Sequence, residues 1–244
     1  EDKAAGYVAF AGVCKAAQNG RPAAAFIYIN IQNIILEDRA FSERVFSTLL
    51  HEVTHGMGFV SSYLGSFLNR QTGLFRPVEE VIISSVSYPI RIQTPELIAW
   101  AANHFGCNEN IPVPLENFGG QGSASSHFDQ LPLGNEMMNP TSYYNSAMSG
   151  ATIAYIESMG YFKPKLPKTK MEELLIWGNG AGCGPLYDNP TCNNIPMVCK
   201  ETGIVCSNDY YSIGQCSSNH DDPTVQNSFS NNCSTFRERL DCRF

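Results

Sequence analysis

The chain has 244 residues, of which 43% are hydrophobic, and a formal net charge of −7. This composition allows a sizeable folded core and excludes a wholly disordered chain. The acidic balance and the lack of a basic run argue against nucleic acid or an anionic membrane surface as a partner. No apolar run approaches the roughly 20 residues of a transmembrane helix. The first residues show no signal-peptide pattern, so we expect a mature form or a segment of a longer protein.

Two apolar segments near the N-terminus, residues 5–13 and 23–31, have the composition of strands. Gly20-Arg21-Pro22 lies between them and is typical of a turn. The next predicted element is a helix over residues 41–57, whose apolar side chains recur at four-residue steps. This spacing predicts one buried stripe on the helix. The stripe consists of Val45, Leu49 and Val53, widened by Phe46 and Leu50.

The same helix carries an H-E-x-x-H motif over residues 51–55, off the apolar stripe. Helix positions i and i+4 are rotated by only ~40° and separated by about 6 Å, so the imidazoles of His51 and His55 leave the same face. Two such nitrogens can bind one Zn²⁺ at roughly 2.0–2.1 Å. Glu52 can accept a proton from a metal-activated water, a role that a closed structural zinc site would not need. A catalytic site also requires a third protein ligand and an open position.

Further elements follow along the chain. Thr94-Pro95 is typical of a helix start, with Thr as the N-cap, and this helix should end at Gly106. A glycine-rich loop at 119–122 either lines the site or simply connects its flanking segments. Helices are also predicted over residues 149–160 and 170–177.

The third metal ligand has three candidate positions. In the compact motif H-E-x-x-H-x-x-G-x-x-H it lies three residues after the glycine, and here that residue is Ser61, which is not a credible ligand. His104 falls in the last turn of a predicted helix, where a structural or surface role is more typical. His127 follows the flexible glycine-rich loop and precedes a turn that contains two methionines, so it is the better candidate.

Carboxylates or backbone carbonyls should fix the orientation of the ligand rings. The carboxylate candidates are Glu116, Asp129 and Glu136, and the sequence does not rank them.

Cysteines dominate the end of the chain. Seven of the nine lie at positions 183, 192, 199, 206, 216, 233 and 242. This density predicts a disulfide-stapled extracellular module. A structural zinc module is disfavoured, because the region has no C-x-x-C pair and His220 is its only histidine. The sequon Asn232-Cys233-Ser234 fits secretion. Since nine is odd, at least one thiol has no partner within the chain.

Taken together, these features resemble the leishmanolysin family, zinc endopeptidases of the metzincin clan found on or outside eukaryotic cells. The resemblance covers about residues 5–185 in one order. The matching segments are Arg21-Pro22-Ala23, residues 50–59, Thr94-Pro95, His104-Phe105-Gly106-Cys107, Pro114-Leu115-Glu116-Asn117, Ser126-His127-Phe128, Asn135-Glu136-Met137-Met138 and residues 177–183. In this family an insertion of several dozen residues separates the motif helix from the third histidine.

The resemblance implies an α+β fold, with a metzincin-like catalytic domain (N-terminal sheet plus motif helix) and a cysteine-rich, disulfide-stapled C-terminal region. It implies that His51, His55 and His127 bind one catalytic Zn²⁺ and that Glu52 is the general base. The expected function is endopeptidase hydrolysis of protein or peptide substrates by a metal-activated water. A catalytically silent adhesion or assembly module is the alternative.

Further details follow from the same resemblance. Met138 becomes the methionine of the turn beneath the metal, with Met137 as the alternative. Cys107 is expected to pair with Cys183. Because the family has a segment before the strands seen here, the catalytic domain is expected to be incomplete at its N-terminal side, and Cys14 to pair with a cysteine in such an upstream partner segment.

Three regions are therefore expected. Residues 1–60 form an N-terminal catalytic subdomain with the zinc-binding helix, and residues 61–165 form a central subdomain with the insertion, the third ligand and the methionine turn. Residues 166–244 form the cysteine-rich domain. The expected location is extracellular or at the cell surface, reached through the secretory pathway.

Overall fold

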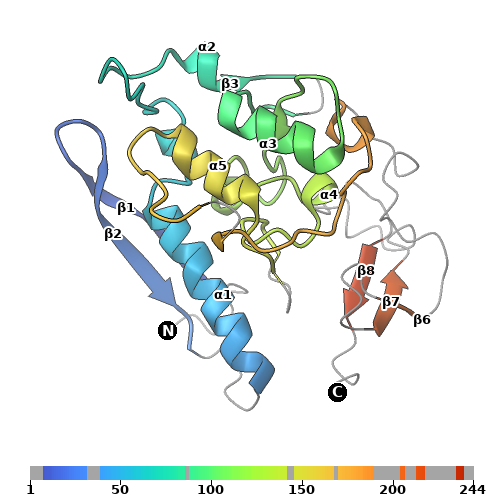
Figure 1. Cartoon of the computed structure of the whole chain (residues 1–244). Coiled ribbons are helices and arrows are strands. Elements are labelled where there is room, and N and C mark those ends of the chain that lie inside the picture. The colour runs from blue at the N-terminus through green and yellow to red at the C-terminus, as the bar shows by residue number, and fades with distance from the viewer. Residues whose placement is uncertain are drawn as a thin grey trace.

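The computed structural model describes residues 8–31, 39–85, 88–141, 146–167 and 170–188, and the backbone of three later strands (Figure 1). These strands, β6 (Ile204–Cys206), β7 (Ile213–Ser217) and β8 (Thr235–Glu238), form one antiparallel sheet. Four tail cysteines (192, 199, 233 and 242), the sequon at 232–234 and His220 lie outside the described residues. The disulfide pattern of the tail therefore stays a prediction.

A hairpin and a long helix form the N-terminal part. Strands β1 (Ala9–Ala16) and β2 (Pro22–Ile29) pair antiparallel, which confirms the two predicted strands and the turn between them. The turn needs glycine at position 20, because its φ is +83° and an added Cβ would meet the hydroxyl of Tyr161 at 2.6 Å. Helix α1 (Arg39–Gly56) packs along both strands, as Figure 1 shows.

The prediction of a buried apolar stripe on α1 is wrong for three of its five side chains, whereas Val45 and Leu50 are half-buried and Leu50 packs against the core. Leu49 and Val53 are exposed by 36% and 44%, and Phe46 by 63%. Glu52 and His55 on the same helix are buried instead. The helix turns this polar side inward because the side chains there meet the central segment of the chain. Four-residue periodicity identifies an apolar face, but it does not reveal which face meets the core.

The central part combines a small sheet with two helices. Strands β3 (Ile82–Ile83), β4 (Arg91–Ile92) and β5 (Val113–Pro114) form an antiparallel sheet in that order. Helix α3 (Pro95–Phe105) ends at Gly106 with φ +65°, and it packs against α5 (Gly150–Ser158). These bounds confirm the helix predicted to end at Gly106 and the helix predicted over residues 149–160. Further short helical turns among the described residues are η1 (Ser61–Tyr63), α2 (Val78–Val81), η2 (Gly120–Gly122), α4 (Gln130–Leu133) and η4 (Gly184–Leu186).

An aromatic cluster lies at the centre of the core. Phe59 stacks on Tyr155 with ring centroids 3.9 Å apart, and Phe128 meets Phe59 edge-on at 4.9 Å. All three rings are fully buried. Aromatic pairs in these geometries stabilise by about 0.5–1.5 kcal/mol beyond the area that they bury. Because Phe59 follows the motif helix closely and Phe128 adjoins His127, this cluster fixes two segments that carry motif residues.

The helix predicted over residues 170–177 is absent, and residues 172–176 have no regular structure. The segment instead lies beside Met148. The N–H of Glu173 donates to the Met148 carbonyl at 2.9 Å, and the Met148 N–H donates to the Glu173 carboxylate at 2.8 Å. Trp177 is buried and its indole donates to the Leu131 carbonyl at 3.0 Å. These contacts outside the segment take the place of a helical turn.

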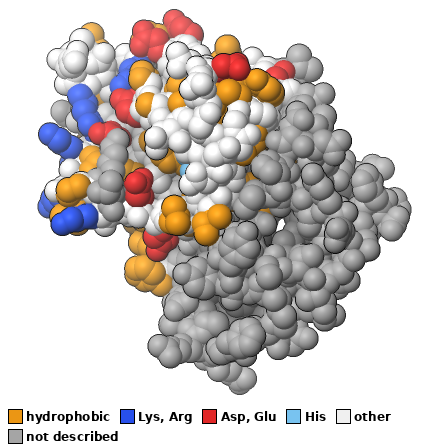
Figure 2. All heavy atoms as spheres, turned by 45° about the vertical axis from the view of Figure 1, so that its right-hand side comes forward, with side chains coloured by type: hydrophobic (Ala, Val, Ile, Leu, Met, Phe, Trp, Pro, Cys, Tyr) orange, Lys and Arg blue, Asp and Glu red, His pale blue; other side chains and the backbone are white. Residues whose placement is uncertain are grey.

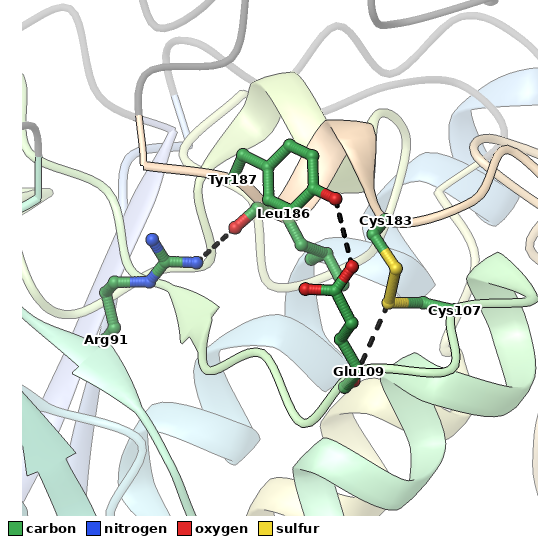
Figure 3. The surroundings of a disulfide bond; sticks show 6 residues. All are labelled: Arg91, Cys107, Glu109, Cys183, Leu186 and Tyr187. Atoms are coloured by element: carbon green, nitrogen blue, oxygen red, sulfur yellow. Dashed lines mark hydrogen bonds between the residues drawn. A yellow bond between two sulfur atoms is a disulfide. The ribbon is translucent and has the colours of Figure 1, made fainter.

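A disulfide joins Cys107, just after α3, to Cys183, which is the pairing that the resemblance implied (Figure 3). Nearby, the Arg91 guanidinium donates to the Leu186 carbonyl, and the Tyr187 hydroxyl donates to the Glu109 carboxylate at 3.0 Å. Residues 183–187 are thereby tied to the small sheet and to the segment that follows α3. Cys14 is exposed and forms no disulfide within the described residues.

Replacing Cys107 and Cys183 together with serine is expected to lower the free energy of unfolding by about 2–5 kcal/mol. The bond closes a loop across 76 residues, and a long loop gains much conformational entropy in the unfolded chain when it is released. Urea unfolding of the oxidised protein measures the change. Cys14→Ser is the matched control, with an expected change within about 0.5 kcal/mol. A double variant as stable as the parent would refute a stabilising role.

The described surface carries mixed charge. In Figure 2, Lys and Arg side chains gather at one edge of the described surface, while acidic side chains are scattered over the face. No basic stripe crosses the described part of that face. None of the helices among the described residues has both the length and the apolar character needed to cross a membrane.

Candidate metal centre

Three histidines converge although they come from distant parts of the chain. His51 and His55 lie one turn apart on α1, and His127 follows the loop after η2. The distances between their Nε2 atoms are 3.0 Å for 51–55, 3.1 Å for 51–127 and 3.2 Å for 55–127. His55 and His127 are buried, and His51 is half-buried. Among the described residues this is the group of His, Cys, Asp or Glu side chains that could hold a metal ion.

Hydrogen bonds at the far side of each ring fix the tautomers. Each Nδ1 meets a backbone carbonyl oxygen, which can only accept, so each Nδ1 carries the proton. The three acceptors are Met137 O for His51 at 2.6 Å, Phe59 O for His55 at 2.7 Å and Ser123 O for His127 at 3.1 Å. In a neutral imidazole the other nitrogen is then an acceptor with a free lone pair. Three Nε2 lone pairs therefore face one another.

The rings are neutral because burial disfavours their charged forms. It lowers the pKa of His51 to about 3, with the neighbouring His55 adding to the effect. Burial also lowers the pKa of His55, and it holds that of His127 well below its usual value. Neutral imidazole is the form that binds a metal ion.

The cluster fits a small divalent cation. Three lone pairs about 3.1 Å apart repel one another unless a positive charge lies between them. A point about 1 Å above the plane of the three nitrogens is about 2.0–2.1 Å from each, which is the length of a metal–imidazole bond. An ion at that point would have three protein nitrogens on one side and no fourth ligand from this group of side chains. The structure thus brings together the three residues proposed as ligands from the sequence.

Glu52 occupies the position directly after His51 on α1. Its side chain is only 4% exposed, and its Oε2 has no hydrogen-bond partner among the described residues. Burial raises its pKa to about 7. A buried carboxyl group without a partner costs stability, and a pKa near neutrality suits a group that both accepts and donates a proton.

The ring partners are backbone carbonyls, not the three carboxylates considered from the sequence. Asp129 caps α4 by accepting the N–H of Leu131 at 2.9 Å. Glu116 accepts the N–H groups of the two residues that follow it. The Phe59 and Ser123 carbonyls could not be predicted from the sequence, because every residue has a carbonyl and no residue type marks these two.

The glycine-rich loop shapes the approach to His127. Gly119 and Gly120 have φ of +83° and +68°, a region that few other residues adopt without strain. The chain turns there and reaches Ser123, whose carbonyl accepts the ring proton of His127. The loop therefore helps to orient this histidine.

The two rejected ligand positions lie elsewhere. The Nε2 of His104 donates to the Trp177 carbonyl at 2.8 Å, and its ring stacks on Trp100 at 4.8 Å. Ser61 is exposed, and its backbone N–H donates to Ser126 at 3.2 Å. Met138 is fully buried. The carbonyl of the residue before it, Met137, accepts the Nδ1–H of His51.

Comparisons with known proteins find similarity to leishmanolysins and leishmanolysin-like peptidases. The family model described as leishmanolysin, peptidase M8, matches residues 2–237. The chain is 28% identical to a leishmanolysin homolog of Crithidia fasciculata over 220 residues, which is 86% of this chain and 31% of that protein. It is 27% identical to leishmanolysin of Leishmania chagasi over 220 residues, 86% of this chain and 34% of that protein. A leishmanolysin-like peptidase of Caenorhabditis elegans is 28% identical over 168 residues, 56% of this chain and 25% of that protein. The chain thus spans about a third of the length of the first two relatives.

Proposed function

Because the chain belongs to the leishmanolysin family of peptidases, we propose that it is a zinc-dependent endopeptidase that hydrolyses peptide bonds within proteins. The observation that supports this proposal most strongly is the convergence of three neutral Nε2 atoms within 3.2 Å of one another. Imidazole nitrogen is a common ligand of zinc. Three protein ligands with one open position are typical of catalytic zinc sites. His51, His55 and His127 would hold the single ion.

When bound, zinc supplies an open coordination position that acidifies water and polarises the scissile carbonyl. Glu52 accepts the proton of the attacking water while the water oxygen bonds to the carbonyl carbon. Glu52 then delivers this proton to the amine nitrogen as the C–N bond breaks. The backbone carbonyls behind the three rings keep the histidines oriented during these steps, and Met138 packs within the turn that supplies one of them.

The proposal extends to the setting of the reaction. Protein or peptide chains are the substrates, and an extracellular or cell-surface location fits the cysteine-rich tail. Cys14 remains a candidate for pairing with a cysteine of another segment.

A metal-exchange experiment tests the function. The protein that carries this chain is assayed on an unfolded protein substrate, with mass spectrometry of the products and of the bound metal. We expect one zinc ion per chain and internal cleavages that stop on chelation and return with added zinc, because the attacking water needs a metal ion to become a nucleophile at neutral pH. One bound zinc without any cleavage would instead favour the adhesion or assembly role. Cleavage that persists after complete metal removal would refute the zinc mechanism.

A further inference from the structure

Glu136 is a buried carboxyl group with hydrogen-bond donors at both oxygens. Its side chain is fully buried. One oxygen, Oε1, accepts the hydroxyls of Ser149 at 3.1 Å and Thr152 at 2.6 Å. The other oxygen, Oε2, accepts the backbone N–H of Met138. Burial raises the pKa of Glu136 to about 7, although all three hydrogen bonds favour the ionised form, so the group carries its charge above about pH 7.

One peptide group connects this carboxylate to the histidine cluster. The peptide bond between Met137 and Met138 has its N–H end on Glu136 and its C=O end on His51. The carbonyl accepts the Nδ1–H of His51 at 2.6 Å. A charged acceptor at the N–H end polarises a peptide group and makes its carbonyl oxygen a stronger acceptor. A stronger acceptor at Nδ1–H in turn makes Nε2 a better metal ligand.

We propose that Glu136 is a positioning residue that strengthens metal binding through this carboxylate–peptide–histidine relay. The proposal rests on the proposed function in that it takes the three histidines as metal ligands. His127 provides a contrast within the same site. The peptide group whose carbonyl accepts its ring proton has its N–H on Ala124, and that N–H donates to the uncharged carbonyl of Gly120 at 2.9 Å. The carboxylate therefore acts on one ligand selectively.

Zinc affinity in a charge-neutral variant tests the relay. Glu136→Gln preserves the shape of the side chain and removes its charge. We expect its zinc Kd, measured on the full protein by competition with a chromogenic chelator, to rise by about 10–100-fold. Glu116→Gln is the matched control, since Glu116 is equally buried but accepts the N–H groups of Asn117 and Phe118. Its Kd should stay within about threefold of the parent value.

The parent protein supplies a second readout that needs no variant. Zinc draws electrons from His51, which should strengthen both hydrogen bonds of the shared peptide group. The amide proton of Met138 should then move downfield in the NMR spectrum when zinc is added. The Ala124 amide should move less, because its acceptor is uncharged. A carboxylate that only held the turn in place would not give this difference, so the amide shift decides the question even if Glu136→Gln fails to fold.

Three results would count against these ideas in distinguishable ways. A tight zinc site in the parent protein with unchanged affinity in Glu136→Gln would overturn the relay alone. A Met138 amide that does not respond to zinc would do the same. A parent protein that binds no zinc would overturn both the relay and the proposed function.

Discussion

Replacing Glu52 with glutamine is expected to lower kcat for peptide hydrolysis by about 10²–10⁴-fold while zinc stays bound. Glutamine has nearly the same shape but cannot accept the proton of the attacking water. Since Oε2 of Glu52 has no hydrogen-bond partner among the described residues, the substitution breaks none there. Steady-state kinetics on a fluorogenic peptide, together with metal analysis of the same samples, measure the effect.

The stability of the metal-free protein gives an independent check on this variant. Burial raises the pKa of Glu52 from 4.5 to about 7. The folded state therefore binds this proton more tightly than the unfolded state, so Glu52 contributes a loss of stability as the pH rises from about 4.5 through 7. The histidines of the cluster, whose pKa values are lowered, contribute a gain over part of this range in both proteins, so the loss is read from the difference between parent and variant. Glu52→Gln should lack this loss. Glu79→Gln, at an exposed position of α2, is the control and should keep parental activity. A zinc-loaded Glu52→Gln enzyme with a third or more of the parental kcat would rule out the general-base role.

Replacing His127 with alanine is expected to weaken zinc binding by about 10²–10³-fold and to remove activity. Structural zinc sites with four ligands bind with about 10–16 kcal/mol, so one ligand contributes about 2.5–4 kcal/mol. Equilibrium dialysis against zinc buffers measures the Kd directly. His104→Ala is the matched control, because His104 bonds the Trp177 carbonyl away from the cluster and its loss should leave the Kd unchanged.

The two histidine variants together identify the third ligand. A His127→Ala protein that keeps parental zinc affinity would show that His127 is not a ligand. If His104→Ala lost the metal instead, the third ligand would have to be reassigned. Melting curves of both metal-free variants separate lost affinity from lost folding.

Local signals in the sequence predicted the helix ends well. Thr94-Pro95 and Gly106 bound α3 where expected, because a proline at the first position and a left-handed glycine act through the backbone alone. The pairing of the hairpin strands likewise follows from a short turn. The face of α1 that meets the core was harder to predict. The exposed Val53 on α1 shows that an apolar face can stay outside when the polar face of the same helix meets the core.

The side chains of the candidate site could be proposed from the sequence, but the groups that hold them in place could not. Motif spacing and family resemblance proposed the three histidines and Glu52, since the expected chemistry requires particular residue types, and the structure brings the three histidine rings together. The carbonyls behind the rings left no trace in the sequence, because they belong to the backbone. Glu116, Asp129 and Glu136 could not be ranked, because the backbone N–H groups that they accept are brought to them by the fold. Only the fold shows that one of them meets the peptide group that holds His51.

The separation of the ligands bears on how the protein is made. His55 and His127 are 72 positions apart, and the carbonyl that orients His51 comes from residue 137. A growing chain therefore leaves the ribosome with its motif helix long before the cluster can close. If the protein is an endopeptidase, as proposed, an unfinished chain has no assembled site with which to cut itself or its neighbours. Distance along the polypeptide would then act as a safeguard during synthesis.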